Sequence, residues 1–311
     1  MTFTASSEHP TDLLSAMQHA GAEFDHSTAA GTGCMPSALL TAYRNYRLVL
    51  RQARAATALS ETQNSTLKKL LLQQKASVES GLALCYYLDH CAHKVSDTPT
   101  ASLLAFLTPV QQYYCATYSQ RANYLAGQTL ALLPQSGEIQ VQVLEPVEHV
   151  SVAGRAEMQQ WLQDCVFADA EAGIFLFRKE LRATVKRAQG FIDDSIRRSL
   201  SLHWDQLESL LAQWQRLWDY FETTLFLNQS EALLDVLAVL CSAWLWLEQA
   251  TLARRKLLAR QPLSIADKAW CRGTLQTCLY VYQHELPYIE QQLALLSQLD
   301  AICLDMELAW F

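Results

Sequence analysis

Residues 232–247 read ALLDVLAVLCSAWLWL and form the longest apolar stretch of the chain. Asp235 interrupts the stretch, and its length falls short of the about 18 to 20 residues that a helix needs to span a bilayer. A helix that is apolar on every face belongs in the centre of a bundle. We therefore predict a buried central helix from Ser230 to Arg260, stopped by Pro262, and no transmembrane segment.

Helical periodicity continues on both sides of this central helix, with short polar turns between the helices. The predicted helices cover about residues 37–59, 61–93, 103–133 and 155–226, and a last pair follows Ser264. Ser60 and Ser264 supply capping oxygens at two helix starts. Gly190 is expected to break a helix, Pro287 to bend or divide one, and Pro109 to mark a kink or a helix start.

Only one segment of the sequence carries a strand signal. Residues 139–143, IQVQV, alternate between apolar and polar side chains directly after a turn at residues 134–137. The predicted fold class is therefore all-α, with two consecutive helical bundles and this short β-like segment. The predicted divisions are an N-terminal tail at 1–35, an up-and-down four-helix bundle at 36–190 and a C-terminal helical domain at 191–311.

The net charge and the cysteine content limit the partners and the cellular compartment that we expect for this chain. The formal net charge of -7 and the pI near 5.6 argue against a nucleic-acid partner, because binding to a phosphate backbone needs clustered Lys and Arg. The 9 cysteines are an odd number, contain no CxxC pair and follow no signal peptide, so a reducing compartment and a cytoplasmic location are expected. Cys241, Cys271, Cys278 and Cys303 are predicted to be small buried hydrophobes.

The sequence lacks the common catalytic and metal-binding motifs. It contains no HExxH, GxSxG, P-loop or GxGxxG pattern, which removes support for metalloprotease, hydrolase and nucleotide-triphosphatase activities. His90 and His93 lie three residues apart near Asp89, but no second cluster of metal ligands accompanies them. Because the helix dipole favours His in a last turn, we interpret both as helix-end residues and expect no metal.

Residues 103–110 read LLAFLTPV, and residues 122–128 read ANYLAGQ. These two stretches resemble the helix that leads to the flavin-contact loop of acyl-CoA dehydrogenases, in the large subfamily with an extra C-terminal domain. The other similar stretches are residues 70–87 for the second bundle helix, 173–181 for the end of the catalytic segment, and 243–253 with 285–287 for the extra domain. The resemblance covers about residues 36–311 and implies a helical relative of enzymes that use FAD.

This sequence also departs from the family in ways that affect the cofactor. We expect neither the N-terminal helical domain nor the β-barrel, which form much of the flavin and acyl-CoA cleft in the family. Where the family carries a Gly-Gly-His-Gly-Tyr-like loop, residues 130–137 read LALLPQSG. Glycines let a backbone approach a cofactor closely, so we expect no bound cofactor here.

The catalytic base of the family is the Glu of a Tyr-Glu-Gly-Thr motif, which falls on residues 167–170. Alignment on Phe167 places Ala168 at the base, whereas gapless alignment on Gly173-Ile174 places Asp169 there. An Asp is one methylene shorter than a Glu, and proton abstraction needs the base within hydrogen-bond reach of the carbon acid. Asp169 is the catalytic candidate of the enzyme hypothesis, which also requires FAD.

A cluster of tyrosines suggests a contact between subunits. One helix carries a denser cluster of tyrosines than a single core-facing side needs, namely Tyr113, Tyr114, Tyr118 and Tyr124. In the resembling family this helix lies close to a subunit partner. We predict an interface there.

These features leave three hypotheses for the function. The first is an acyl-CoA dehydrogenase-like protein that is inactive alone and serves as an accessory or structural partner, either as a homo-oligomer or paired with a full-length dehydrogenase. The second is a flavin-dependent acyl-CoA oxidoreductase that uses Asp169 as its base. The third is a helical scaffold unrelated to acyl-CoA chemistry, because a fold alone does not carry a function.

Overall fold

The computed structural model describes residues 36–56, 59–93, 98–133, 155–167, 173–218, 220–260 and 262–310, and the regular secondary structure of these residues is entirely helical. The predicted all-α fold class is confirmed. The predicted N-terminal tail and the strand-like residues 139–143 lie outside the described residues.

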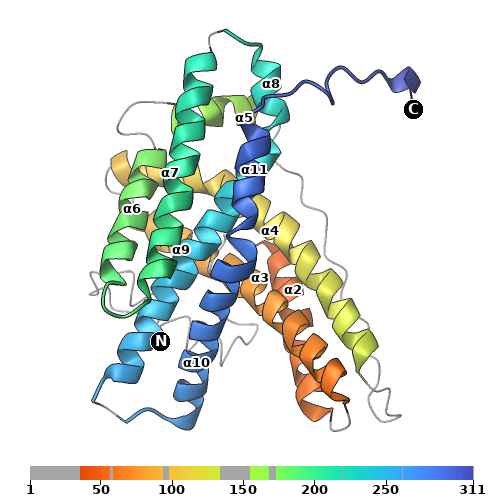
Figure 1. The fold of residues 1–311 in the computed structure, drawn as a ribbon, viewed down its shortest axis with the longest axis vertical. Helices are drawn as coiled ribbons and strands as arrows, with labels where there is room; N and C mark the ends of the chain where they lie inside the picture. Colours follow the sequence, from red (N-terminus) through yellow and green to blue (C-terminus); the bar gives the residue numbers. More distant parts are fainter. Residues whose placement is uncertain are drawn as a thin grey trace.

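The helices follow one another along the chain as Figure 1 shows. In order they are α2 (Ser37–Ala55), α3 (Glu61–His93), α4 (Thr98–Leu132), α5 (Arg155–Trp161), η1 (Leu162–Val166), α6 (Gly173–Arg187), α7 (Asp194–Leu217), α8 (Thr223–Asn228), α9 (Ser230–Leu258), α10 (Ile265–Tyr280), η2 (Val281–Glu285), α11 (Tyr288–Leu296) and η3 (Leu308–Trp310). The segments η1 and η2 are π-helical, and η3 is a 3-10 turn.

Local capping groups start and end these helices near the predicted positions. The Ser60 hydroxyl accepts the Gln63 N–H at 3.2 Å, and the Gln63 side chain accepts the Ser60 N–H at 3.0 Å, which is a reciprocal capping box at the start of α3. The Ser264 hydroxyl accepts the Asp267 N–H at 3.0 Å at the start of α10. Gly190 has a φ of 80°, which glycine adopts without strain, and it separates α6 from α7.

The two prolines that were expected to disturb helices differ in their effect. Pro109 lies inside α4, so it does not mark a helix start. Pro287 stands directly before α11, where it has no N–H to continue an α-helical hydrogen-bond ladder. The π-helical turn η2 precedes it, with the Leu286 N–H donating to the Val281 carbonyl at 2.8 Å. The predicted division at Pro287 is confirmed.

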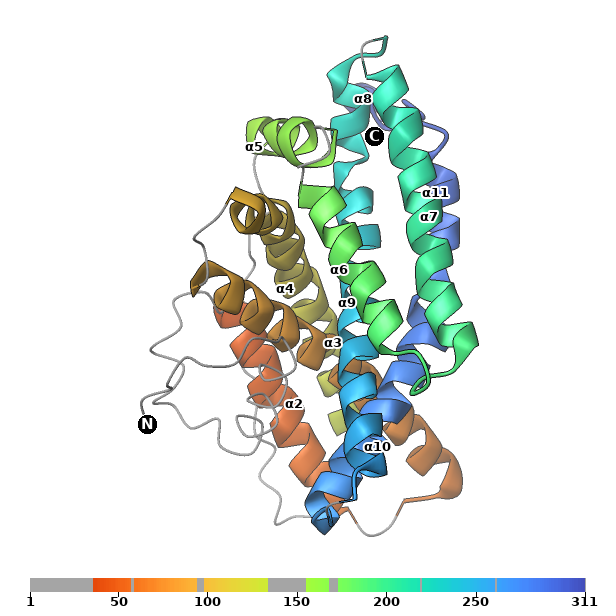
Figure 2. The ribbon, with the colours of Figure 1, turned by 90° about the vertical axis from the view of Figure 1, so that its left-hand side faces the viewer.

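The central helix of the fold is α9. Figures 1 and 2 show it passing between the α3–α4 pair and the α7–α11 pair, and most residues from Leu233 to Ala253 are buried. Among the described residues, α9 is the one helix long and apolar enough to cross a membrane, and 78% of its apolar window is buried inside the fold. Such burial is the environment of a core helix, as predicted from its sequence.

Aromatic side chains connect the helices through one main core. The ring centroid of Phe177 on α6 lies 5.9 Å from that of Phe106, 5.5 Å from that of Trp204 and 5.2 Å from that of Trp244. The main hydrophobic cluster therefore joins residues from both sides of the predicted boundary at residue 190, and the division into two domains stays a prediction. A smaller cluster lies where α2 packs on α3 and α4.

Candidate functional site

Two carboxylates lie inside the helical assembly beside α4. Asp235 of α9 is half-buried and accepts hydrogen bonds from the hydroxyls of Tyr118 at 3.1 Å and Tyr113 at 3.4 Å. Glu285 of η2 is buried, and one of its oxygens lies 3.5 Å from the guanidinium of Arg121. We call these five residues the carboxylate–tyrosine cluster.

The polypeptide positions this cluster from three separate segments. Tyr113, Tyr118 and Arg121 follow one another along α4, while the central helix supplies Asp235. Glu285 ends the π-helical turn η2, directly before the residues that lead into α11. Single π-helical turns occur frequently at functional sites, so this turn marks the cluster as the candidate site.

Burial controls the protonation of both carboxylates. It raises the pKa of Asp235, and the hydrogen bonds from Tyr118 and Tyr113 oppose the rise. Burial also raises the pKa of Glu285, against the opposing charge of Arg121. Burial raises the pKa of Tyr113 and Tyr118, so the two phenols act as neutral donors. The cluster connects α4 to α9 and to η2 through polar contacts.

The structure changes the interpretation of the four tyrosines that were predicted to form an interface. Tyr113, Tyr114 and Tyr118 are only 5%, 1% and 6% exposed, and they have partners inside their own chain. Two donate to Asp235, and the Tyr114 hydroxyl donates to the Ser77 carbonyl at 3.0 Å. Their density is thus explained by internal polar contacts, and only Tyr124, at 68% exposed, is placed to contact a subunit.

The catalytic candidate Asp169 lies outside the described residues, as do Ala168 and Glu171. The described residues on either side are held by the core. The Phe167 carbonyl accepts from the Gln215 side chain at 3.0 Å. Gly173 packs so closely on α4 that an added Cβ would lie 2.3 Å from the Cβ of Phe106. The role of Asp169 stays a prediction.

The histidines near the end of α3 have local contacts. His93 is exposed, and its Nδ1 lies 2.8 Å from the Asp89 carbonyl oxygen, one turn earlier. Both His90 and His93 stand in the last turn of the helix, as interpreted from the sequence. Within the described part of the chain, no group of three or more His, Cys, Asp or Glu side chains could hold a metal ion.

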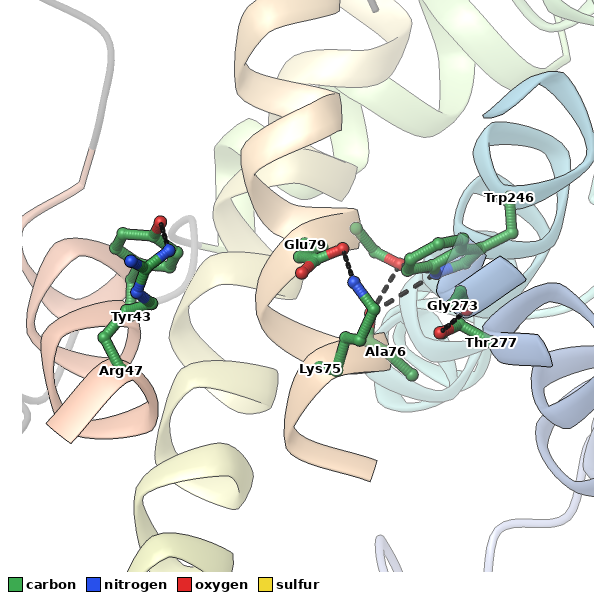
Figure 3. Close-up of polar contacts among 9 residues, drawn as sticks. Tyr43, Arg47, Lys75, Ala76, Glu79, Trp246, Gly273 and Thr277 are labelled. Atoms are coloured by element: carbon green, nitrogen blue, oxygen red, sulfur yellow. Dashed lines mark hydrogen bonds and ion pairs between the residues drawn. The ribbon is translucent and has the colours of Figure 1, made fainter. Parts of the chain in front are cut away.

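A polar seam that the sequence did not reveal joins α3 to α9. The indole N–H of Trp246 donates to the Ser80 hydroxyl at 2.8 Å, and this hydroxyl lies 2.7 Å from that of Ser242. Figure 3 shows Trp246 beside Lys75, which forms an ion pair with Glu79. The Lys75 ammonium lies 5.5 Å from the centre of the indole ring, within range of a cation–π interaction. These contacts fix the two helices side by side.

The buried ion pair of Glu248 with Arg187 was also not predicted from the sequence. Glu248 of α9 accepts two hydrogen bonds from the Arg187 guanidinium, at 3.1 and 3.2 Å. The same guanidinium donates to the Thr184 hydroxyl at 2.8 Å, which in turn accepts from the indole of Trp244. These hydrogen bonds satisfy the charged groups of the ion pair, which is how a buried charge pair is tolerated in a core.

The cysteines only partly match the prediction. Cys241, Cys271 and Cys278 are buried, whereas Cys303 is exposed, because the segment after α11 leaves the core. A contact between Cys85 and Cys115, whose sulfur atoms are 3.7 Å apart across two helices, was not predicted.

Residues 177–307 match the protein family described as Acetyl-CoA dehydrogenase C-terminal like. This part of the chain, from α6 to the segment after α11, is therefore an acyl-CoA dehydrogenase C-terminal-like helical region, as the resemblance implied. Asp235 and Glu285 lie within the match, and residues 36–176 lie outside it. No curated protein matches the chain.

Proposed function

We propose that this chain, whose residues 177–307 form an acyl-CoA dehydrogenase C-terminal-like helical region, is an accessory subunit that binds another protein and is catalytically inactive alone. The partner we propose is a full-length acyl-CoA dehydrogenase in the cytoplasm, with a second copy of this chain as the alternative. The chain would carry no cofactor of its own.

Exposed large apolar side chains before α8, at the end of α11 and in the segment after α11 are the observation that carries this proposal. These side chains, which we call the end surface, are 49% to 83% exposed: Tyr220, Phe221, Leu295, Ile302 and Trp310. Figure 1 shows the C-terminal segment, which contributes Ile302 and Trp310, running out from the body of the fold beyond α11. A contiguous exposed apolar patch marks a protein interaction site, and we propose that these side chains form one.

Two hydrogen bonds between α7 and the end of α11 support one part of the end surface. The indole N–H of Trp214 donates to the Leu296 carbonyl at 3.2 Å, and the Gln213 side chain donates to the Ser297 carbonyl at 3.3 Å. These bonds tie the last turn of α7 to the end of α11, which is where the C-terminal segment begins. The end of α11, which carries Leu295 of the end surface, is therefore fixed to α7.

The buried polar groups support inactivity of the isolated chain. Asp235 is engaged by two tyrosines, Glu285 faces Arg121, and Glu248 is paired with Arg187. A general base must reach a proton on a bound substrate. In these three cases the carboxylate faces groups of its own chain, so each serves packing between helices.

The proposal is tested by measuring mass and flavin content together. Size-exclusion chromatography with light scattering and a visible absorbance trace is run on the chain alone and after co-expression with an acyl-CoA dehydrogenase encoded beside it. We expect a colourless chain that co-elutes with the dehydrogenase. Stoichiometric flavin on the chain alone would support the oxidoreductase hypothesis with Asp169 as base, and a colourless chain without any partner would support the unrelated scaffold.

A variant pair shows whether the end surface makes the contact. Replacing Ile302 and Trp310 by serine should abolish co-elution without affecting the fold, because both side chains are exposed. The matched control is Ile265→Ser, since Ile265 is 90% exposed at the start of α10, away from the end surface. Equal loss of the complex in the control would contradict a specific role for the end surface.

A further inference from the structure

Two thiols lie against each other between α3 and α4. The Sγ atoms of Cys85 and Cys115 are 3.7 Å apart. Their side chains are buried, at 2% and 1% exposed. A disulfide needs the sulfur atoms at about 2.0 Å, so a small approach of the two helices would be enough to join them.

The surroundings make the two thiols unequal. The Gln111 side chain donates to the sulfur of Cys85 at 3.1 Å and lies farther, at 3.8 Å, from that of Cys115. The hydrogen bond from Cys115 lowers the pKa of Cys85, burial opposes this, and Gln111 adds to the lowering. The same contact, together with burial, raises the pKa of Cys115. Because the thiolate is the nucleophile, Cys85 is the thiol that reacts first.

We propose that Cys85 and Cys115 form a modification site at which a small peroxide generates a reversible disulfide between α3 and α4. The Cys85 thiolate attacks a peroxide oxygen, the O–O bond breaks, and the departing hydroxide takes up the proton that Cys85 released. Cys115 sulfur then attacks the sulfur of the Cys85 sulfenic acid, the S–O bond breaks, and the hydroxide leaves as water with the Cys115 proton. Two thiols and one hydrogen peroxide thus give one disulfide and two waters, and a small thiol reverses the reaction.

Access to the pair is controlled by α2. Leu39, Tyr43 and Tyr46 of α2 pack in the same hydrophobic cluster as both cysteines. Figure 2 shows α2 on the outside of the α3–α4 pair. The Asn45 side chain donates to that of Asn123 on α4 and adds one polar contact. A peroxide molecule therefore reaches the sulfur atoms when α2 separates from its two neighbours, and the rate of oxidation reports this opening.

The test maps the disulfide in the full-length chain. Cys34→Ser and Cys303→Ser are introduced first, because Cys303 is exposed and Cys34 lies outside the described residues. The reduced protein is treated with hydrogen peroxide while its circular dichroism stays unchanged, the remaining thiols are alkylated in denaturant, and the peptides are analysed by mass spectrometry. We expect a peptide pair linked through Cys85 and Cys115 that disappears on reduction. Recovery of both as alkylated thiols, at peroxide doses that oxidise other cysteines, would overturn the proposal.

Single variants then separate the roles of the two thiols. In Cys115→Ser the reaction should stop at the sulfenic acid of Cys85, which a dimedone probe traps. In Cys85→Ser the probe should label Cys115 roughly tenfold less, because burial still raises the pKa of Cys115 and Gln111, at 3.8 Å, lies farther from its sulfur than from that of Cys85. Equal labelling of the two variants would contradict the assignment of Cys85 as the nucleophile.

A last comparison tests control by α2. Leu39→Ala removes a buried contact of α2 with the pair's cluster and should speed disulfide formation several-fold. Leu296→Ala removes an equally buried leucine from α11, which belongs to the main core cluster, and should leave the rate near that of the parent chain. Acceleration by both variants, or by neither, would show that α2 does not gate the site.

Discussion

Asp235 stands in α9, the largely buried central helix, where its carboxylate has the hydroxyls of Tyr118 and Tyr113 as donors. Such a group has an energetic cost when charged, because the surrounding helices replace water that would solvate it. The hydrogen bonds offset part of this cost, yet burial still raises the pKa of Asp235. Its hydrogen bonds connect α9 to α4 and give the apolar core a polar contact that fixes how the two helices meet.

This residue gives the stability a pH dependence of defined sign. Because the pKa of Asp235 is raised in the folded chain, folding favours its protonated form. Its contribution is fully present below the usual aspartate pKa, about 4, and is lost as the pH rises through the raised value. Relative to Asp235→Asn, the free energy of unfolding of the parent chain should therefore fall as the pH is raised from about 4 to neutrality. Urea titrations across this range measure it, and parallel curves for the two proteins would rule the prediction out.

At the scale of helices, Gly173 lets α6 lie very close to α4. A Cβ added to Gly173 would lie 2.4 Å from the Ser102 carbonyl oxygen and 2.3 Å from the Cβ of Phe106, and backbone cannot yield as a flexible side chain can. Gly173→Ala should thus destabilise the chain by about 1 to 3 kcal/mol or more, the usual cost of overpacking. The matched control is Gly273→Ala on α10, where nothing lies within 4 Å of the new Cβ and alanine should stabilise the helix by about 0.5 to 1 kcal/mol. Chemical denaturation distinguishes these opposite signs.

The helices themselves could be predicted from the sequence because their signals are local. The capping box at Ser60, the break at Gly190 and the division at Pro287 each depend on residues within one or two turns. The contacts between helices could not be predicted from the sequence, since Tyr118 and Asp235 are separated by 117 positions and no periodicity links them. The tyrosines were consequently predicted to form an interface between subunits, although three of them are buried within their own chain.

For the whole molecule, the main consequence of the packing is that α9 joins the two parts which the sequence suggested were separate. Phe177 contacts aromatic rings on α4, α7 and α9, so its core belongs to helices from both sides of residue 190. Such a shared core favours a single cooperative unfolding transition. The acyl-CoA dehydrogenase C-terminal-like region at 177–307 would then depend on α3 and α4 for its stability.

Truncating Phe177 tests this dependence. Phe177→Ala should lower the free energy of unfolding by about 3 to 5 kcal/mol, the usual cost of removing a buried phenylalanine. Because the core is shared, hydrogen exchange followed by mass spectrometry should show peptides from α4 and from α9 losing protection by the same amount. The control is Phe175→Ala on the same helix, where the half-buried ring should cost less. Loss of protection confined to α4, with α9 unchanged, would mean that the two predicted bundles unfold independently and that the boundary at residue 190 separates real domains.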